Sequence, residues 1–530
     1  MQSVMAHSFS QAPTADIPRS TFNRSHGYKT TFDAGKLIPI FVDEALPGDT
    51  LNLNPTLFAR LNTPIYPIMD NMFMDVHWFS VPYRQIWDNF RKFCGEQTDP
   101  GDSTDYTVPI AVSTTSAAIS TGELGDYMGL PIGKDSLEIS ALPARAYRHI
   151  YNEWYRDQNL IDSVVFATDD GPDGLSETQY AAPPLSRGKR HDYFTSCLPW
   201  LQKGDAVDLP LGTTAPVEFL AAGNQITVNS SGTAKQIAGF TSQAGTGYLW
   251  DASSAVTNLD PNGTLYTDLS SATASTVNEL RQAFQIQKLL ERDARSGTRY
   301  AEIVKSHFGV TFQDVTYRPE YLGGNSTPIN ISQVPQTSES NTTPQGNLAA
   351  FGTAMMNGGG FTKSFTEHCI VMGIASVRAD LTYQQGLDRM WSRQTRYDFF
   401  WPSLSHIGEQ SVLNKEIYAQ DQSVDTGSTG TPDNERVFGY QERWAEYRYK
   451  QSKITGLLRS DAASSLDSWH LSQEFASLPE LNETFITENP PIDRVVAVPS
   501  EPDFLMDCYF NYQCARPMPL FSVPGLIDHF

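Results

Sequence analysis

The feature that most constrains the fold is the way apolar residues are grouped between Pro18 and Phe90. They form short runs, and each run ends at a proline, a glycine or an Asn-Pro pair. Short strands joined by long loops give this spacing, whereas helices need longer uninterrupted stretches. The block contains almost no clustered acid, base or nucleophile, so it indicates structure rather than catalysis.

Individual segments support a β-rich fold. Met72–Val81 is apolar on much of both faces, which predicts a strand buried between layers. Phe504–Cys514 alternates apolar and polar residues, which predicts a half-buried strand. Cys369–Val377 predicts a further strand, and Leu37–Val42 is interrupted by Pro39, which suits an edge strand. Together they predict an all-β sandwich with large insertions.

A few helices interrupt this pattern. Ala144–Arg156 follows a proline and repeats aromatic and aliphatic residues at helical spacing. Thr276 and Glu279 form a capping box that opens a second helix, for which Gly297 is a plausible end. A short helix is expected at Tyr300–Phe308. The preceding stretch, 205–275, is rich in Ser, Thr, Gly, Ala and Asn, and it predicts a surface insertion without a large core.

Charge and motif content exclude several classes of protein. The net charge of −22 argues against a free-standing nucleic-acid binder. Five cysteines without CxxC spacing indicate reduced thiols rather than disulfides or a zinc site. No two histidines lie closer than 19 residues, which removes the local metal motifs of zinc hydrolases. No apolar run approaches membrane-spanning length. We therefore predict no enzyme activity, catalytic residue, metal site, cofactor or membrane insertion.

Two groups of cations stand out. Arg187, Lys189 and Arg190 form the densest local positive charge. A second group lies among Trp391, Tyr397 and other aromatic residues and consists of Arg389, Arg393 and Arg396. Arginine beside aromatic rings suits single-stranded nucleic acid, because guanidinium pairs with phosphate and rings stack on bases. The same chemistry is enriched at protein interfaces. For the second group we favour an interface or intrachain packing, and DNA contact stays open.

Asp169, Asp170 and Asp173 form an acidic group beside two glycines. Paired carboxylates of this kind serve glycosidases. Nothing in the local sequence raises the pKa of one of them, so a solvated turn is the simpler interpretation.

Two long segments resemble a known family. Pro18–Phe90, together with Val498–Phe504 (VPSEPDF) and Arg516–Phe530 (RPMPLFSVPGLIDHF), is similar to the major capsid protein of gokushoviruses, which are small single-stranded-DNA bacterial viruses of the microvirus family. The resemblance implies an eight-stranded antiparallel jelly-roll sandwich with long loop insertions and a few helices. It also implies self-assembly into a small icosahedral shell around a circular single-stranded DNA genome.

The resemblance further implies a division of the chain into an N-terminal arm, a first part of the core with a helical insertion, a surface insertion, a second part of the core and an extended C-terminal arm. The corresponding residues are 1–33, 34–204, 205–276, 277–515 and 516–530. The arm 1–33 is expected to lack structure of its own and to become ordered only against something else. The insertion 205–276 would build a protrusion at the threefold axes and contact the bacterial host through a surface receptor or glycan.

Particular residues follow from this expectation. Arg19, Arg24 and Lys29 would face the genome from the N-terminal arm. The anchors of the C-terminal arm between copies would be Phe521, Leu526, Ile527 and Phe530. Further expected partners are a small basic DNA-packaging protein, a scaffolding protein and a minor pilot protein. The protein would reside in the virion after assembly in the host cytoplasm. The alternative is a carbohydrate-binding or glycan-processing jelly-roll protein that uses the three aspartates or the polar insertion.

Overall fold

The computed structural model describes residues 18–112, 118–134, 137–175, 180–207, 277–311 and 317–521, and between 208 and 276 the backbone of several short strands. The chain divides into two compact units. One unit joins Met1–Leu201 to Thr298–Phe530, and the other is Gln202–Gly297. Each unit is described by itself.

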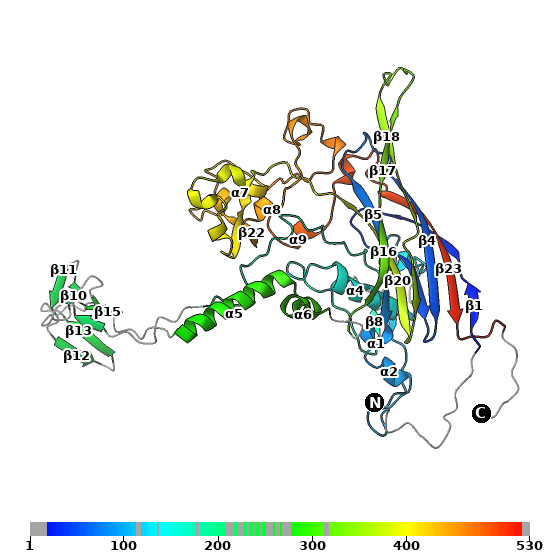
Figure 1. The fold of residues 1–530 in the computed structure, drawn as a ribbon, viewed down its shortest axis with the longest axis horizontal. Coiled ribbons are helices and arrows are strands. Elements are labelled where there is room, and N and C mark those ends of the chain that lie inside the picture. Colours follow the sequence, from blue (N-terminus) through cyan, green and yellow to red (C-terminus); the bar gives the residue numbers. More distant parts are fainter. Residues whose placement is uncertain are drawn as a thin grey trace. The chain divides into compact units, whose positions relative to one another are not determined.

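The first unit is built on two antiparallel sheets (Figure 1). In the first sheet the order is β23–β4–β18–β17, with β1 and β2 both paired to the outer side of β23 and β19 paired to β4. The bounds are β1 Ser20–Asn23, β2 His26–Phe32, β4 Thr50–Leu61, β17 Asn330–Pro335, β18 Leu348–Asn357, β19 Phe361–Ser364 and β23 Phe504–Arg516.

The second sheet has the order β16–β5–β20–β3. Its strands are β3 Ile38–Ala45, β5 Met72–Pro82, β16 Glu320–Pro328 and β20 Cys369–Ala379. The interrupted run around Pro39 therefore does form an edge strand, where a residue without an N–H costs no ladder hydrogen bond.

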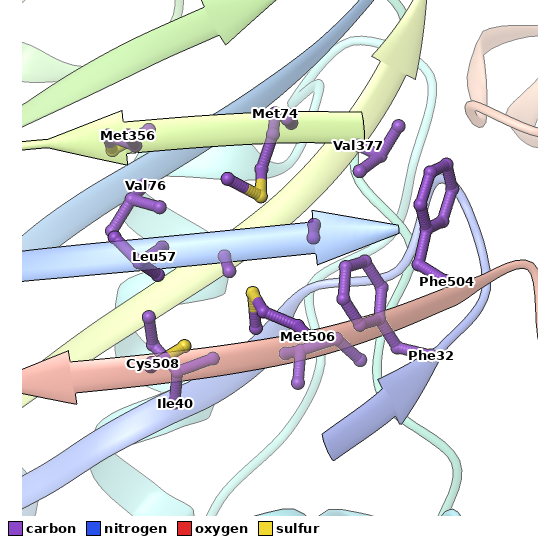
Figure 2. Close-up of a cluster of buried hydrophobic side chains, with 14 of the residues drawn as sticks. Phe32, Ile40, Leu57, Met74, Val76, Met356, Val377, Phe504, Met506 and Cys508 are labelled. Carbon is purple, nitrogen blue, oxygen red and sulfur yellow. The ribbon is translucent and has the colours of Figure 1, made fainter. Parts of the chain in front are cut away.

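The main core fills the space between the two sheets (Figure 2). Met74, Val76 and Trp78 of β5 point into it and are fully buried. From the opposite sheet, β23 contributes the apolar side of its alternating pattern, including Met506 and Cys508. The prediction of a half-buried strand at this position is confirmed, since the residues between them remain exposed.

The other side of β5 is covered as well. Phe79 and Val81 pack in a second apolar cluster with Tyr147 and Ile150 of helix α4 (Leu142–Ile150). This explains why β5 is apolar on both faces, because it lies between the core and a helical layer. The helix α4 continues as a single π-helical turn, Tyr151–Tyr155, so the predicted helix at 144–156 is confirmed.

Short elements surround this second cluster. They are α1 Tyr83–Ile86, α2 Phe90–Phe93, β6 Ile110–Val112, α3 Leu124–Tyr127, β7 Ile139–Ser140 and β8 Asp173–Gly174. The helix α6, Tyr300–Phe308, ends at Gly309, whose φ of 70° is left-handed as the sequence predicted for a glycine stop.

The long connection between β20 and β23 folds into its own small lobe, drawn in yellow and orange in Figure 1. It contains β21 Glu409–Leu413, α7 Asn414–Ile417, β22 Val437–Glu442, α8 Ala445–Arg448 and α9 Glu483–Ile486. A separate apolar cluster with Phe194, Val412 and Phe438 holds it together.

The second unit includes the whole stretch expected to be an insertion. It carries three small antiparallel groupings: β10 Thr227–Ser230 with β11 Thr233–Gln236 and β14 Asn258–Leu259, β12 Gly239–Gln243 with β13 Thr246–Trp250, and β9 Val217–Phe219 with β15 Leu265–Thr267. The helix α5, Val277–Ser296, has Glu279 of the predicted capping box in its first turn and ends before Gly297, whereas Thr276 lies outside the described residues.

The N-terminal segment differs from the expected unstructured arm. Residues 20–32 form β1 and β2, which pair in register with β23 along nearly its whole length. The physical reason is that β23 offers a free edge of 13 residues to a pairing strand. A polar segment can pair with this edge, because the pairing uses backbone hydrogen bonds and needs no apolar side chains. Residues 1–17 lie outside the described residues. Among the helices that the structure describes, none is long and apolar enough to cross a membrane.

Candidate assembly surfaces

Two of the three N-terminal cations hold their segment onto the sandwich. Arg24 forms a two-pronged ion pair with Asp43 of β3, and its guanidinium lies 5.3 Å from the ring centre of Tyr512. The Tyr512 hydroxyl donates to the same carboxylate at 2.7 Å. Arg19 donates to the Gly48 carbonyl and, at 3.2 Å, to a threonine hydroxyl on β4. These groups therefore stabilise the docked strands β1 and β2.

Lys29 is placed differently. Its ammonium group is exposed and lies 3.9 Å from Asp507, a distance at which a surface pair contributes little. It lines a cleft of about 760 Å³ on the side of the first sheet that faces away from the core. The outward residues of β2, β4 and β23 form its floor, and the C-terminal end of α3, with Tyr127, forms a wall.

Cations and rings meet inside this cleft. Arg60 of β4 lies 5.1 Å from the ring centre of Phe58, and strand register brings Phe58 opposite Asp507 and Arg60 opposite Leu505. The Tyr127 hydroxyl donates to the backbone of β2 at 3.0 Å, which fixes the wall. The cleft was missed in the sequence, because β2, β4 and β23 are far apart in the chain and alternation does not reveal which strands are neighbours.

Of the second group of cations, Arg389 is internal. It donates to Glu416 at 3.1 Å and to the Ser411 carbonyl at 2.6 Å. Glu416 is buried and also accepts from the Tyr193 hydroxyl at 2.8 Å. Burial raises the pKa of Glu416, and the charge of Arg389 opposes this shift. Arg389 therefore stabilises the lobe between β20 and β23.

Arg393 and Arg396 lie among rings at the surface of the lobe. Arg393 is 3.4 Å from Glu446 and 4.3 Å from the ring centre of Tyr447. Arg396 lies 4.8 Å from the ring centre of Trp401. These two arginines therefore lie beside exposed aromatic side chains, whereas Arg389 pairs with the buried Glu416.

The acidic group at 169–173 is not a simple solvated turn, so that interpretation was wrong in part. Asp173 is buried and forms a two-pronged ion pair with the fully buried Arg145, at 2.7 and 2.8 Å. Asp170 accepts from the Trp87 indole at 2.7 Å and from Asn89. Asp169 and Asp170 are both exposed, and Asp173 is the buried member of the group. Asp173 and Asp170 hold the helical layer together, and no local pattern reveals partners that lie 28 and 83 residues away.

The dense positive charge at 187–190 is also largely internal. Arg187 bonds to the buried Asp75 at 2.7 Å. Lys189 is buried, and its ammonium group donates to Gln473 at 2.8 Å and lies 4.6 Å from the ring centre of Phe485. This burial lowers the pKa of Lys189 to about 8. The density of charge in sequence therefore reflects packing of this loop against the second sheet.

The C-terminal segment leaves the sandwich from a fixed point. Arg516, the last residue of β23, bonds at 2.9 Å to Asp49, whose side chain is fully buried. Phe521 is largely exposed. Leu526, Ile527 and Phe530 lie outside the described residues. Within the described part of the chain, no group of three or more His, Cys, Asp or Glu side chains is arranged to hold a metal ion.

Comparison with known proteins identifies the class to which these surfaces belong. A family model described as capsid protein (F protein) matches residues 10–526. The chain is 48% identical to capsid protein VP1 of Bdellovibrio phage phiMH2K and 43% identical to capsid protein VP1 of Chlamydia phage 1, in each case over 99% of this chain and 98% of the relative. It is 35% identical to capsid protein VP1 of Spiroplasma virus 4 over 98% of this chain and 97% of that protein.

These matches cover almost the whole of both chains, so they apply to the complete architecture and not to one module. They agree with the resemblance to gokushovirus capsid proteins, and they assign the protein to the virion as a structural component that is not an enzyme. The chain is a major capsid protein and belongs to the capsid protein (F protein) family.

Proposed function

We propose that copies of this chain assemble into a small icosahedral shell that encloses a circular single-stranded DNA genome. The observation that carries the proposal is the family match over residues 10–526. Of the carboxylates at 169–173, Asp173 pairs with Arg145, and Asp170 accepts from Trp87 and Asn89, so both have structural partners. That use also leaves the carbohydrate-processing alternative without an observation in its favour.

We further propose that the sandwich is an eight-stranded jelly roll. Eight strands make up its two four-stranded sheets, in chain order β2, β3, β4, β5, β16, β18, β20 and β23. Numbered in that order, one sheet runs 1-8-3-6 and the other 2-7-4-5. Strands that alternate between two sheets in this way form the paired Greek keys of a jelly roll. On this view β1, β17 and β19 are additions to the first sheet.

The remaining segments have proposed roles in the shell. Residues 205–276 form a protrusion at the threefold axes that contacts a host receptor or glycan. The segments 1–33 and 516–530 act as arms, with Phe521, Leu526, Ile527 and Phe530 anchored between copies. A small basic DNA-packaging protein, a scaffolding protein and a minor pilot protein are further proposed partners, and assembly takes place in the host cytoplasm. Support for these roles comes from the family relationship.

Particle formation tests the central proposal. The full chain would be expressed in bacteria, purified without denaturation, and measured by negative-stain microscopy and light scattering. Uniform closed shells are expected. A population of monomers and small oligomers only, also after co-expression with the other virion proteins, would contradict self-assembly.

The genome contact requires its own test. Lys29 and Arg60 line the cleft on the outward side of the first sheet, beside Phe58 and Tyr127, and this pairing of cations with rings suits single-stranded DNA. The double variant Lys29→Ala/Arg60→Ala should form shells with less nuclease-protected DNA. The matched control is Arg91→Ala/Lys450→Ala, which removes two exposed cations elsewhere. Equal protected DNA in both variants would exclude the cleft as a genome contact.

A further inference from the structure

Large aromatic side chains gather on the lobe between β20 and β23. We call this the aromatic surface, and it consists of Met390, Trp391, Tyr397, Phe399, Phe400, Trp401 and Tyr447. Trp391 is 69% exposed and Tyr397 is 70% exposed. Single exposed apolar residues are ordinary, but Phe399, Phe400 and Tyr447 are joined through shared contacts with Arg393 and Trp444, and exposed apolar clusters of this kind mark interaction sites.

The aromatic surface is held in place by contacts of its own. Phe400 packs edge-on against Trp444, with ring centres 5.7 Å apart. The Arg393 guanidinium lies between two rings, 4.3 Å from the centre of Tyr447 and 5.5 Å from that of Phe399. The Trp401 indole donates to the Arg396 carbonyl at 3.1 Å. Side chains that are fixed before binding lose less conformational entropy when a partner arrives.

The residue beneath the surface is conformationally strained. Trp444 has a φ of 72°, which bulky residues rarely adopt. It is buried, its indole donates to the Leu404 carbonyl at 2.9 Å, and its backbone N–H donates to Gln410 at 3.2 Å. The lobe therefore maintains an unfavourable backbone conformation in order to keep this ring under Phe400 and Tyr447.

Charge indicates what kind of partner fits. Three guanidinium groups accompany the rings, those of Arg393, Arg396 and Arg443. The chain carries 60 acidic and 38 basic side chains, so another copy can offer carboxylates to these guanidinium groups and basic side chains to Glu446 and Asp398. Trp, Tyr and Arg are also the residues that dominate binding energy at protein interfaces.

A polyanion is a poorer match than a protein. Glu446 lies 3.4 Å from Arg393 and already offsets its charge. Asp398 accepts from the backbone and hydroxyl of Thr395 within the same surface, and these hydrogen bonds lower the pKa of Asp398. Phosphates on this surface would therefore meet two carboxylates.

From these observations we infer that the aromatic surface is a contact between neighbouring copies of this chain in the shell. This inference rests on the proposed function, because it requires copies to assemble. A standard interface buries roughly 800 Å² on each partner, and its centre is a small cluster of aromatic and arginine side chains surrounded by a polar rim. The aromatic surface supplies such a centre.

Hydroxyl-radical footprinting read by mass spectrometry tests the inference directly. Oxidation of Trp391 and Tyr397 would be compared in unassembled subunits, empty shells and DNA-filled shells. Because a buried interface centre excludes water, both residues should react roughly tenfold more slowly in both kinds of shell than in free subunits. Trp444, which is buried in the subunit, serves as the internal control and should react slowly throughout.

The outcomes separate this inference from the proposed function. If the wild-type chain forms no particles, self-assembly itself is refuted and the inference falls with it. If shells form and Trp391 and Tyr397 react as they do in free subunits, only the inference is refuted. Protection in DNA-filled shells alone would assign the surface to the genome and would also overturn the inference.

Substitution gives an independent measurement. The double variant Trp391→Ser/Tyr397→Ser should reduce the yield of shells at least tenfold, while circular dichroism of the subunit is unchanged. The matched control is Phe308→Ser, which removes an equally exposed aromatic side chain from α6. Normal shell yield from the double variant would overturn the inference.

Discussion

Asp75 connects its own strand to three other parts of the first unit, so its replacement should lower the free energy of unfolding. Its carboxylate accepts from Arg187 at 2.7 Å, from Arg378 at 2.9 Å and from the Ser326 hydroxyl at 2.6 Å. It thereby joins β5 to β16, to β20 and to the loop that carries Arg187. The side chain of Asp75 is 6% exposed, and those of its two arginine partners are 14% and 12% exposed.

The expected cost follows from this burial. Removing one partner of a buried ion pair destabilises a protein by about 3–5 kcal/mol, because the other charge is left uncompensated. Both guanidinium groups keep some access to water, so we expect about 3 kcal/mol for Asp75→Asn at pH 7. The Asn amide can still accept from Ser326, but its NH₂ group cannot pair with a guanidinium.

The pH dependence of this cost has a definite sign. Burial alone would raise the pKa of Asp75, but the hydrogen bond from Ser326 and the charges of Arg187 and Arg378 outweigh it, and the pKa lies below 3.8. A lowered pKa in the folded state contributes stability that is present above the unfolded value and lost as pH falls through the folded value. The difference between wild type and Asp75→Asn should therefore be full at pH 7 and shrink below about pH 3.8.

Urea unfolding of unassembled subunits, followed by tryptophan fluorescence, measures both quantities. Asp507→Asn is the matched control, because Asp507 is 61% exposed and only 3.9 Å from Lys29, and it should cost less than about 0.5 kcal/mol. A cost below about 1 kcal/mol for Asp75→Asn at pH 7 would refute the reasoning. So would a cost that stays constant into acid.

Three further predictions use other buried groups. A Cβ on Gly373 would lie 2.3 Å from the Trp78 ring, so Gly373→Ala should lower the free energy of unfolding by about 1–3 kcal/mol. Gly27→Ala is the control, because a Cβ there makes only ordinary contacts and should change this free energy little. Equal effects of the two substitutions would contradict the packing argument. Burial raises the pKa of Asp503 from 3.8 to about 6, so the stability from its protonated form is lost as pH rises from the unfolded value through the folded value. In urea unfolding, Asp503→Asn should therefore gain on wild type between about pH 3.8 and pH 6, and a pH-independent difference would show that the carboxyl is not buried as described. Cys94 is exposed and the other four cysteines are buried, so a thiol reagent should label one cysteine rapidly in the native subunit and all five in urea. Rapid labelling of two or more cysteines in the native subunit would contradict the burial of these four side chains.

Sequence reasoning succeeded where the cause of structure is local. The alternation in 504–514 and the two apolar faces of 72–81 depend only on side chains within each strand, and both strands formed as predicted. The same is true of α5, which ends directly before Gly297, and of α6, which ends at Gly309. These signals lie within a few residues of the feature that they specify.

What the sequence could not provide is the identity of distant partners. The carboxylate of Asp173 looked solvated because Arg145 lies 28 residues away, on a helix that only the fold brings close. β2 was taken for an unstructured arm because its pairing partner is the last strand of the chain. The cleft beside Lys29 depends on the order of strands in the first sheet. Each error concerns a contact between segments whose proximity is decided by topology.

The use of cations also bears on how a genome would be neutralised. Of the six basic residues that the sequence offered for DNA contact, Arg24, Arg389 and Arg393 have carboxylate partners within 3.4 Å, and Arg19 bonds to the backbone and a hydroxyl of its own chain. Lys29 and Arg396 are the ones that the described part of the fold leaves for another molecule.

The two cations that line the cleft, Lys29 and Arg60, can position a strand, but they cannot offset the charge of a packaged polyanion inside a shell whose subunits each carry −22. Phosphate contacts fix where a nucleic acid lies, whereas condensation needs many more positive charges. The charge distribution of this chain therefore favours a division of labour, in which the capsid protein orients DNA at a few points and a separate small basic protein neutralises the rest.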